Sequence, residues 1–404
     1  MNNLHLFNPG HETAVCFGKE NYTPPSNVLK MMTDLSCLPL WYAEEGDFVL
    51  TKTEECIGYL AKLPNELHPR VYPTDSNLLK SMGHFMPELK AAPWGLSPHS
   101  LHIFRSLQKE CNISLDIPTW EAHYSTLFNR RTAAECLELI KSALPGYKLP
   151  DTPVFCSQLE EIEKYLSGKR NTYILKAPYS SSGRGLQWIQ NARLSPNNYR
   201  WINGVLKKQQ MVSIEPALDN KQDFAMEFYS DGAGNIQYLG VSVFGTAQRG
   251  AYEGNLLGSQ TFLEETIGQI TKQSCYTDIK DALTDSLKKK IAFAYKGYFG
   301  VDMLLYCPQS NNNFLQIHPC VEINFRTTMG IIALSLSKNL LAKNSTGNFN
   351  IRYYGKNNTA LQCYQKYKER YPLNISKGKI VSGYLSLCPV KENTSYLANV
   401  LVQP

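Results

Sequence analysis

Two apolar segments near residue 300 most constrain what this chain can fold into. Residues 300–305 and residues 321–326 are both rich in apolar and β-branched side chains, and each carries oxygen ligands: Asp302 in the first, Glu322 and Asn324 in the second. The segment between them is polar and turn-forming. Apolar runs joined by such a segment predict a β-hairpin with these three polar side chains on its strands.

The strand period of two puts Glu322 and Asn324 on one face of the hairpin, and a suitable register brings Asp302 opposite them. Two carboxylates and an amide oxygen on one face call for a cation. An all-oxygen set suits Mg²⁺, with Mn²⁺ as the alternative, completed by phosphate oxygens. Arg326 comes next on that face and can meet an anion. Each residue alone would be read as a cap or a solvated group, but together they indicate a nucleotide-triphosphate site.

A second segment, residues 173–189, contains a candidate phosphate loop. An apolar strand delivers Lys176, whose ammonium suits a phosphate, and small residues follow before the next apolar run. Their backbone N–H groups and hydroxyls can close over phosphate oxygens. Arg184 is either a phosphate contact or a surface residue, and alone the loop is equally well an ordinary flexible turn. The loop residues are Ser181, Ser182, Gly183, Arg184 and Gly185.

Residues 209–228 lie between these sites and suit the recognition of a nucleoside. Residues 209–218 predict a strand that ends in a linker, and residues 222–228 predict an alternating strand. The backbone of such a linker can read adenine while a nearby carboxylate accepts from ribose hydroxyls. This hypothesis places Glu215 at the adenine edge and Asp223 at the ribose. Without the flanking sites, Glu215 would be read as a surface residue.

Taken in order, these four motifs resemble the ATP-grasp superfamily over roughly residues 125–330. The resemblance implies ATP and Mg²⁺ as ligands. It implies that Arg130, with Arg131 as the alternative, is the cation before the first small subdomain, and that Arg326 is the basic catalytic residue near the transferred phosphate. Arg249 can bind an acyl phosphate or a substrate carboxylate, or else lies in an exposed glycine-rich loop. The implied metal ligands are Asp302, Glu322 and Asn324, and the implied nucleotide contacts are Arg130, Lys176, residues 181–185, Glu215 and Asp223.

The fold expected from this resemblance is α/β. An N-terminal three-layer domain of the pre-ATP-grasp kind is followed by an ATP-grasp fold of two subdomains. The expected boundaries are 1–120 for the N-terminal domain, 121–204 for the subdomain with the phosphate loop, 205–335 for the subdomain with the metal site, and 336–404 for a C-terminal extension that packs on the ATP-grasp core.

Local patterns refine this expectation at both ends of the chain. A short strand at residues 4–7 leads into a turn with His11 and Glu12, which are either substrate-site candidates or part of a helix cap. Residues 38–42 predict a further strand. In the tail, residues 331–341 predict a helix, and strands are expected near 351–354 and 380–387.

Composition limits the function classes. A net charge of +6 without a basic-aromatic stripe argues against nucleic acid, and no apolar run is long enough to span a membrane. The 11 cysteines show no paired or metal-like spacing, which favours reduced thiols and a cytoplasmic location. The N-terminal residues also lack the pattern of a signal peptide.

The function expected from these features is ATP-dependent ligation of a small-molecule carboxylate to an amine through an acyl phosphate. A phosphotransferase on the same fold and a non-catalytic ATP-binding protein remain as alternatives. The acid, the amine and the oligomeric state stay open, a homo-oligomer included.

Overall fold

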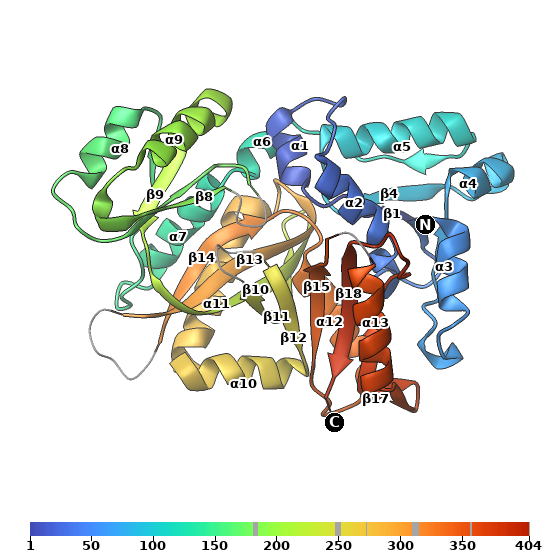
Figure 1. The fold of residues 1–404 in the computed structure, drawn as a ribbon. Coiled ribbons are helices and arrows are strands. Elements are labelled where there is room, and N and C mark those ends of the chain that lie inside the picture. Colours follow the sequence, from blue (N-terminus) through green and yellow to red (C-terminus); the bar gives the residue numbers. More distant parts are fainter. Residues whose placement is uncertain (181–184, 247–251, 272, 309–314, 356–357, 404) are drawn as a thin grey trace. The chain divides into compact units, whose positions relative to one another are not determined.

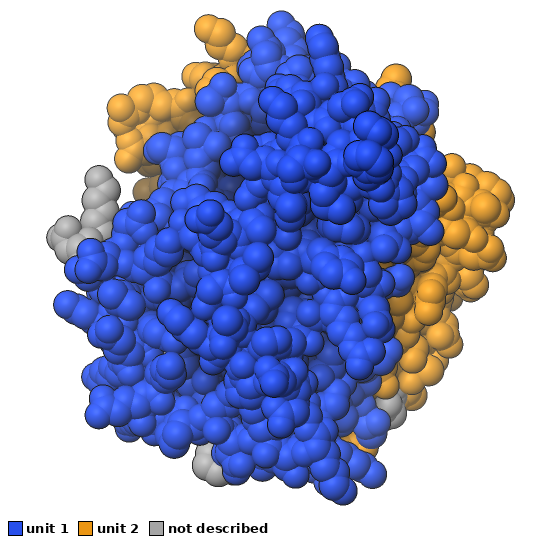
Figure 2. Space-filling view, turned by 90° about the vertical axis from the view of Figure 1, so that its right-hand side faces the viewer, with its two compact units in different colours: residues 1–121, 253–263, 326–404 blue, residues 122–252, 264–325 orange. Residues whose placement is uncertain are grey.

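The computed structural model describes residues 1–180, 185–246, 252–271, 273–308, 315–355 and 358–403. By its internal contacts the chain divides into two compact units (Figure 2). Unit 1 comprises Met1–Glu121, Glu253–Leu263 and Arg326–Pro404, and unit 2 comprises Ala122–Tyr252 and Glu264–Phe325. The four-part division expected from the sequence stays a prediction.

Unit 1 contains a parallel five-stranded sheet in the order β3-β2-β1-β4-β5 (Figure 1). Its first strand lies in the middle: the chain adds strands on one side as far as β3, then crosses to the other side for β4. The carboxyl ends of β1 and β4 therefore flank a topological switch point, where open α/β sheets bind ligands. The strands are β1 (Asn3–Leu6), β2 (Phe48–Leu50), β3 (Tyr72–Thr74), β4 (Leu89–Pro93) and β5 (Leu115–Asp116).

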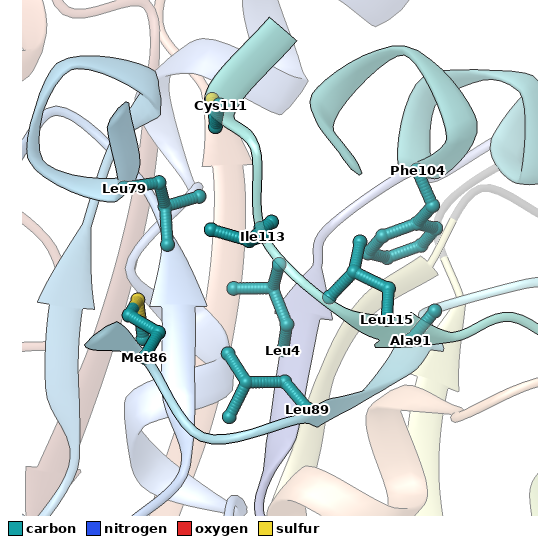
Figure 3. Packing of buried hydrophobic residues seen from close by; sticks show 9 residues of the cluster. All are labelled: Leu4, Leu79, Met86, Leu89, Ala91, Phe104, Cys111, Ile113 and Leu115. Atoms are coloured by element: carbon teal, nitrogen blue, oxygen red, sulfur yellow. The ribbon is translucent and has the colours of Figure 1, made fainter. Parts of the chain in front are cut away.

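Helices connect these strands, as right-handed crossovers between parallel strands require. Helices α4 and α5 share one face of the sheet, where Leu79 and Phe104 pack against Leu4, Leu89 and neighbouring apolar side chains (Figure 3). This cluster forms the apolar core on that face of the sheet. The connecting helices are α1 (His11–Phe17), α2 (Ser26–Asp34), α3 (Thr53–Leu60), α4 (Ser76–Met82) and α5 (Pro98–Cys111), with the short 3₁₀ turns η2 (Asn65–Leu67) and η3 (Gly83–Phe85).

The strand predicted at residues 38–42 is wrong. Leu38–Trp41 forms a 3₁₀ helix, η1, and all four of its side chains are buried. The physical reason is Pro39, which has no N–H to give to a strand ladder and is favoured in the first turn of a helix.

A second group of strands in unit 1 has the order β12-β15-β18-β17-β16, and each neighbouring pair in this order is antiparallel. The helix and the two strands expected in the tail are confirmed as α12, β15 and β17, whereas β18 was not predicted. The elements are β12 (Tyr252–Leu257), α12 (Met329–Asn339), β15 (Gly347–Tyr353), α13 (Thr359–Arg370), β16 (Asn374–Ser376), β17 (Lys379–Ser386) and β18 (Tyr396–Val402).

Unit 2 begins with an antiparallel sheet in the order β6-β9-β7-β8. Helices α8 and α9 supply Ile162, Leu166 and Ile202 to a core shared with these strands. The strand that delivers Lys176 is thus fixed by burial. The elements are α6 (Tyr124–Leu127), α7 (Arg131–Ala143), β6 (Val154–Cys156), α8 (Leu159–Leu166), β7 (Tyr173–Lys176), β8 (Leu186–Ile189), η4 (Gln190–Ala192), α9 (Pro196–Gln209) and β9 (Val212–Pro216).

The rest of unit 2 contains four long antiparallel strands in the order β14-β13-β10-β11. They include the hairpin predicted around Asp302, which is confirmed. The strands are β10 (Asp219–Asp231), β11 (Ile236–Thr246), β13 (Lys296–Cys307) and β14 (Gln316–Asn324), and the helices that precede the hairpin are α10 (Gln260–Thr271) and α11 (Gln273–Ile291). Within the described ranges, no helix has the length and apolar character needed to cross a membrane.

Candidate functional site

The hairpin of β13 and β14 places the three predicted metal ligands on one face of the sheet. Asp302 pairs directly with Glu322, and Gly300 pairs with Asn324. Directly opposed residues of an antiparallel pair point to the same face, as do residues two apart on one strand. Asp302, Glu322 and Asn324 therefore share a face, as the sequence predicted.

Arg130 connects this face to the start of the phosphate loop. Its Nη1 lies 2.9 Å from Oε2 of Glu322, and its Nη2 donates to the hydroxyl of Ser180 at 3.1 Å. Arg131 is directed elsewhere, with its guanidinium carbon 5.0 Å from the centroid of the Phe155 ring. Of the two arginines that the sequence left open, Arg130 is therefore the one that contacts a predicted metal ligand, Glu322.

Lys176, at the end of β7, forms an ion pair with Glu215 of β9. Lys176 is paired with Ser213 across the two strands, so Glu215 is its diagonal neighbour on the same face. Both side chains are nearly buried, with 8% and 12% of their areas exposed. Each of these two charges stabilises the other, because an ammonium or a carboxylate buried without a partner would carry a large desolvation penalty.

His318 on β14 faces this ion pair. Its imidazole is fully buried, and Nδ1 accepts the backbone N–H of Cys320 at 3.3 Å. Burial lowers the pKa of His318 to about 4; the charge of Glu215 opposes this shift and that of Lys176 adds to it. The ring is thus neutral near pH 7, and because Nδ1 accepts a hydrogen bond, the proton is on Nε2.

A cavity of about 270 Å³ opens beside Glu215 and His318. This volume approaches the lower end of the range for small-molecule sites. Its wall combines apolar side chains with polar and charged ones, so it offers both a packing surface and hydrogen-bond partners to a ligand. The lining residues are Lys148, Leu149, Pro150, Asp151, Glu215, Pro216, Leu218, Tyr306, Pro308, Gln316 and His318.

Strand β10 contributes two carboxylates to the sheet face that carries the predicted metal ligands. Asp223 accepts hydrogen bonds from the hydroxyl of Thr246 at 2.6 Å and from the amide of Asn220 at 3.0 Å. Glu227, which is 1% exposed, accepts from the hydroxyl of Ser242 at 2.9 Å. Its partner across the ladder is Gly300, which in turn pairs with Asn324, so Glu227 shares the face of the predicted metal ligands.

Sequence reasoning missed Glu227 and His318. A signal was present for both, because each is a polar residue inside an otherwise apolar strand segment. The sequence Ala225-Met226-Glu227-Phe228 and the sequence Ile317-His318-Pro319 show this pattern.

Gly185 is the described end of the predicted phosphate loop. Its carbonyl accepts the N–H of Ala177 at 2.8 Å, and a Cβ at this position would lie 2.3 Å from Cβ of Ser180. Only glycine fits this close approach of the two ends of the loop. The other predicted loop residues, Ser181, Ser182, Gly183 and Arg184, and the predicted catalytic residue Arg249, lie outside the described residues.

Unit 1 holds a second polar cluster, at the switch point between β1 and β4. The side-chain amide of Asn8 donates to the carbonyl of Gly95 at 2.8 Å and accepts the Gly95 N–H at 3.2 Å. The His11 ring packs on Gly95 so closely that a Cβ there would lie 2.2 Å from Cγ of His11. The turn after β1 is thus fastened to the turn after β4.

Glu12 and Arg326 complete this cluster. Nε of Arg326 donates to Oε1 of Glu12 at 2.7 Å, and Nδ1 of His11 lies 3.4 Å from Oε2. Burial by itself would raise the pKa of Glu12, but the charges of His11 and Arg326 outweigh burial and hold this pKa well below its usual range. Glu12 is therefore a carboxylate that orients Arg326. Arg326 follows Asn324, the last residue of β14, by two residues and belongs to unit 1. Its predicted role near the transferred phosphate stays a prediction.

Comparison with known proteins gives one curated relative and several solved structures. No family model matches the sequence. The [butirosin acyl-carrier protein]–L-glutamate ligase of Niallia circulans is 24% identical over 192 residues, which is 46% of this chain. The match spans 41% of the length of that relative.

Several solved structures match over 100% of this chain, and two of them illustrate the likeness. The biotin carboxylase of Campylobacter jejuni, in a β-γ-ATP complex, has a TM-score of 0.50 at 12% identity, with 88% of it covered. The pyruvate carboxylase of Rhizobium etli has a TM-score of 0.51 at 12% identity, with 36% of it covered. The chain has an ATP-grasp fold. The resemblance inferred from four short motifs and the predicted α/β class are both confirmed.

Proposed function

We propose that this chain is an ATP-dependent ligase that joins a carboxylate to an amine through an acyl phosphate. The observation that carries the proposal is the contact of Arg130 with both Glu322 and Ser180. It brings the oxygen-rich hairpin face and the beginning of the phosphate loop to one guanidinium. A nucleotide triphosphate needs such a pairing of cations and carboxylates around its phosphates.

The 270 Å³ cavity would take the base of ATP. The linker that begins with Glu215 and Pro216 offers backbone groups to the edge of adenine. His318, neutral and protonated on Nε2, offers one donor. Asp223, near the N-terminal end of β10, would accept hydrogen bonds from the ribose hydroxyls.

Lys176 would bind the phosphates. Its ammonium has three donors, of which the ion pair with Glu215 takes one, so donors remain for phosphate oxygens. The hydroxyl of Ser180 and the loop at residues 181–185 would add neutral and backbone donors. Arg130 would neutralise charge on the side nearest Glu322.

The donor set at the hairpin fits Mg²⁺. Two carboxylates and one amide oxygen share a face, and in the structure a cationic group, Nη1 of Arg130, already lies against Glu322. Mg²⁺ commonly takes one or two carboxylates and completes its shell with water and phosphate oxygens. When bound by Asp302, Glu322 and Asn324, it would supply positive charge to the phosphates.

The chemical step would require positioning and charge stabilisation but no enzyme nucleophile. An oxygen of the substrate carboxylate attacks the γ-phosphorus, the bond to the β-γ bridging oxygen breaks, and ADP leaves. An amine then attacks the acyl carbon, phosphate leaves with the bonding electron pair, and the amine gives up a proton. Arg326, oriented by Glu12, would bind the carboxylate and then the acyl phosphate, and Arg249 is proposed to assist.

The name of the relative suggests the first substrates to test. That protein is named as a ligase of L-glutamate and an acyl-carrier protein. L-glutamate therefore comes first among the candidate substrates of this chain, and a carrier-protein acceptor is tested beside free amines.

The deciding experiment is an incubation with ATP, Mg²⁺ and pooled amino acids, in which ADP release and product masses are followed together. ADP with an amide product supports the ligase. ADP with a stable phosphate ester identifies a phosphotransferase, and ATP binding without ADP release identifies a non-catalytic protein. The Asp302→Asn variant is the matched control for contaminating ATPase activity.

A further inference from the structure

Glu227 is a buried carboxylate that the proposed reaction does not use. It lies on β10, where the register of the sheet can be followed across four neighbouring strands from β11 to β14 (Figure 1). Its partners across the ladder are Gly240 on one side and Gly300 on the other, and Gly300 pairs in turn with Asn324. Because glycine has no side chain, the side chains of this row are those of Glu227 and Asn324.

The next row on the same face carries the other two predicted metal ligands. Ala225 pairs with Ser242 on one side and with Asp302 on the other, and Asp302 pairs with Glu322. Residues two apart on a strand share a face, so both rows project from the same side of the sheet. Glu227 therefore faces the proposed metal site and not the apolar core. The row between them projects from the opposite face with four buried apolar side chains: Val241, Met226, Val301 and Ile323.

A hydrogen bond holds Glu227 on the side of the site away from the predicted ligands. The hydroxyl of Ser242 on β11 donates to Oε1 of Glu227 at 2.9 Å. Asp302 and Asn324 lie on the other side of β10, one and two strands away, and each strand spacing is about 4.8 Å. Glu227 thus lies beside the group of three predicted ligands, and the bond to Ser242 keeps its carboxylate outside that group.

A carboxylate in this place carries a cost for the fold. Glu227 is 1% exposed, and taking a charge out of water carries a desolvation penalty that an apolar side chain would avoid. The charges of Asp302 and Glu322 on the same face also repel it while no cation is bound. A metal ion gives this carboxylate a use. Mg²⁺ keeps several of its waters, and acceptors that hydrogen-bond to the groups around a metal strengthen its binding.

We propose that Glu227 is a positioning residue for the metal ion of the proposed ligase, acting from outside the group of direct ligands. The inference rests on the metal site of the proposed function. The carboxylate of Glu227 accepts hydrogen bonds from water around the ion and adds a negative charge to the face, and both effects raise the affinity of the site for the ion. The role depends on the charge of Glu227 and not on its shape.

The test measures the binding of Mn²⁺, the paramagnetic alternative to Mg²⁺, to the full-length chain at a fixed concentration of ADP. Electron paramagnetic resonance gives the free Mn²⁺, so the result does not depend on turnover, and the same ADP without protein is the blank. Glu227→Gln keeps the shape of the side chain and removes its charge, and it should weaken Mn²⁺ binding about tenfold.

Glu227→Asp separates the role of the charge from that of the shape. It keeps the charge on a shorter side chain and should retain most of the affinity for Mn²⁺. The opposite order, with tight binding in Glu227→Gln and weak binding in Glu227→Asp, would overturn the proposal, because shape and not charge would then decide the affinity.

Two further variants separate this inference from the proposed function. Asp302→Asn removes a predicted direct ligand and should weaken Mn²⁺ binding more than Glu227→Gln does. If Asp302→Asn weakens binding and Glu227→Gln does not, the proposed metal site stands and the role of Glu227 is wrong. If neither variant weakens binding, the metal site itself is wrong and the inference falls with it. The matched control Asp231→Asn removes the same charge from the last residue of β10, about 13 Å along the strand, and should bind Mn²⁺ as the natural chain does. A tenfold loss in that control would show a general effect of charge and would also overturn the proposal.

Discussion

Arg130 and Glu322 lie at opposite ends of unit 2 in the sequence, yet Nη1 of the arginine and Oε2 of the glutamate are 2.9 Å apart. The arginine is 9% exposed and the glutamate 23%, so the pair is only partly screened by water. Through Ser180, the same guanidinium reaches the phosphate loop. This contact links the motif at residue 130 to the hairpin that carries the proposed metal ligands.

The first prediction concerns those ligands. Asp302→Asn and Glu322→Gln should each lower Mg²⁺-dependent ADP release by about a hundredfold, the usual cost of removing a preorganised charge from a reacting centre. Both replacements keep the shape of the side chain, so the melting temperature should change little. Glu369→Gln, in an exposed position of α13, serves as the control. Full turnover in both hairpin variants would show that the metal assignment is wrong.

The second prediction concerns Lys176. Its removal should weaken ATP binding about tenfold or more, since a charge-assisted hydrogen bond contributes roughly 1.5–3 kcal/mol. The single variant Lys176→Met also leaves Glu215 buried without its partner, so it should lose stability. The double variant Lys176→Met with Glu215→Gln should regain stability but not ATP affinity, as measured by calorimetry. Recovery of ATP affinity in the double variant would show that Lys176 acts only through the fold.

The third prediction is a pH dependence from His318. Its pKa is about 4 in the folded chain and 6.5 as an ordinary value, so between these pH values the unfolded chain binds more protons. Stability from this residue is present above pH 6.5 and is lost as the pH falls toward 4. Linkage gives a loss of about 2 kcal/mol between pH 7.5 and pH 5. In urea unfolding, His318→Asn should show a correspondingly smaller pH dependence, and an unchanged one would remove His318 as its source.

The fourth prediction tests Glu12 as a positioning residue. Glu12→Gln keeps a hydrogen-bond acceptor for Arg326 but removes the negative charge, so the guanidinium should be held less firmly. We expect the KM for the carboxylate substrate to rise about tenfold, by the loss of a charge-assisted contact, while ATP affinity stays constant. Equal losses for carboxylate and ATP would instead point to general disruption of the fold.

The sequence predicted those parts of the site that depend on local pattern. A period of two along an apolar strand determines which side chains share a face, and the predicted pairing of Asp302 with the second strand of its hairpin is present. The strand that ends at Lys176 was also recognisable, because a short apolar run before a glycine-rich loop has few other interpretations.

Contacts between distant segments were not predictable. Nothing near residue 12 indicates that Glu12 pairs with Arg326. Such contacts depend on how distant helices and strands pack together. The residues next to each partner in the sequence carry no signal of that packing. The strand expected at residues 38–42 failed for a different reason: its apolar pattern is equally that of a buried 3₁₀ turn, and Pro39 decides between the two.

The last prediction concerns the close packing of His11 on Gly95. A methyl group at position 95 would lie 2.2 Å from Cγ of His11, far inside van der Waals contact, so Gly95→Ala must displace the ring or the β4 turn. We expect a loss of about 1–3 kcal/mol in the free energy of unfolding, the usual cost of overpacking. His11→Ala removes the ring and makes room for the methyl group. The double variant should therefore be more stable than the sum of the two single losses predicts, by about 1 kcal/mol in a double-mutant cycle measured by urea unfolding. Gly58→Ala, in α3 with open space around its Cβ position, is the control and should not couple to His11. Strict additivity of Gly95→Ala and His11→Ala would mean that the two turns are not fastened through this contact.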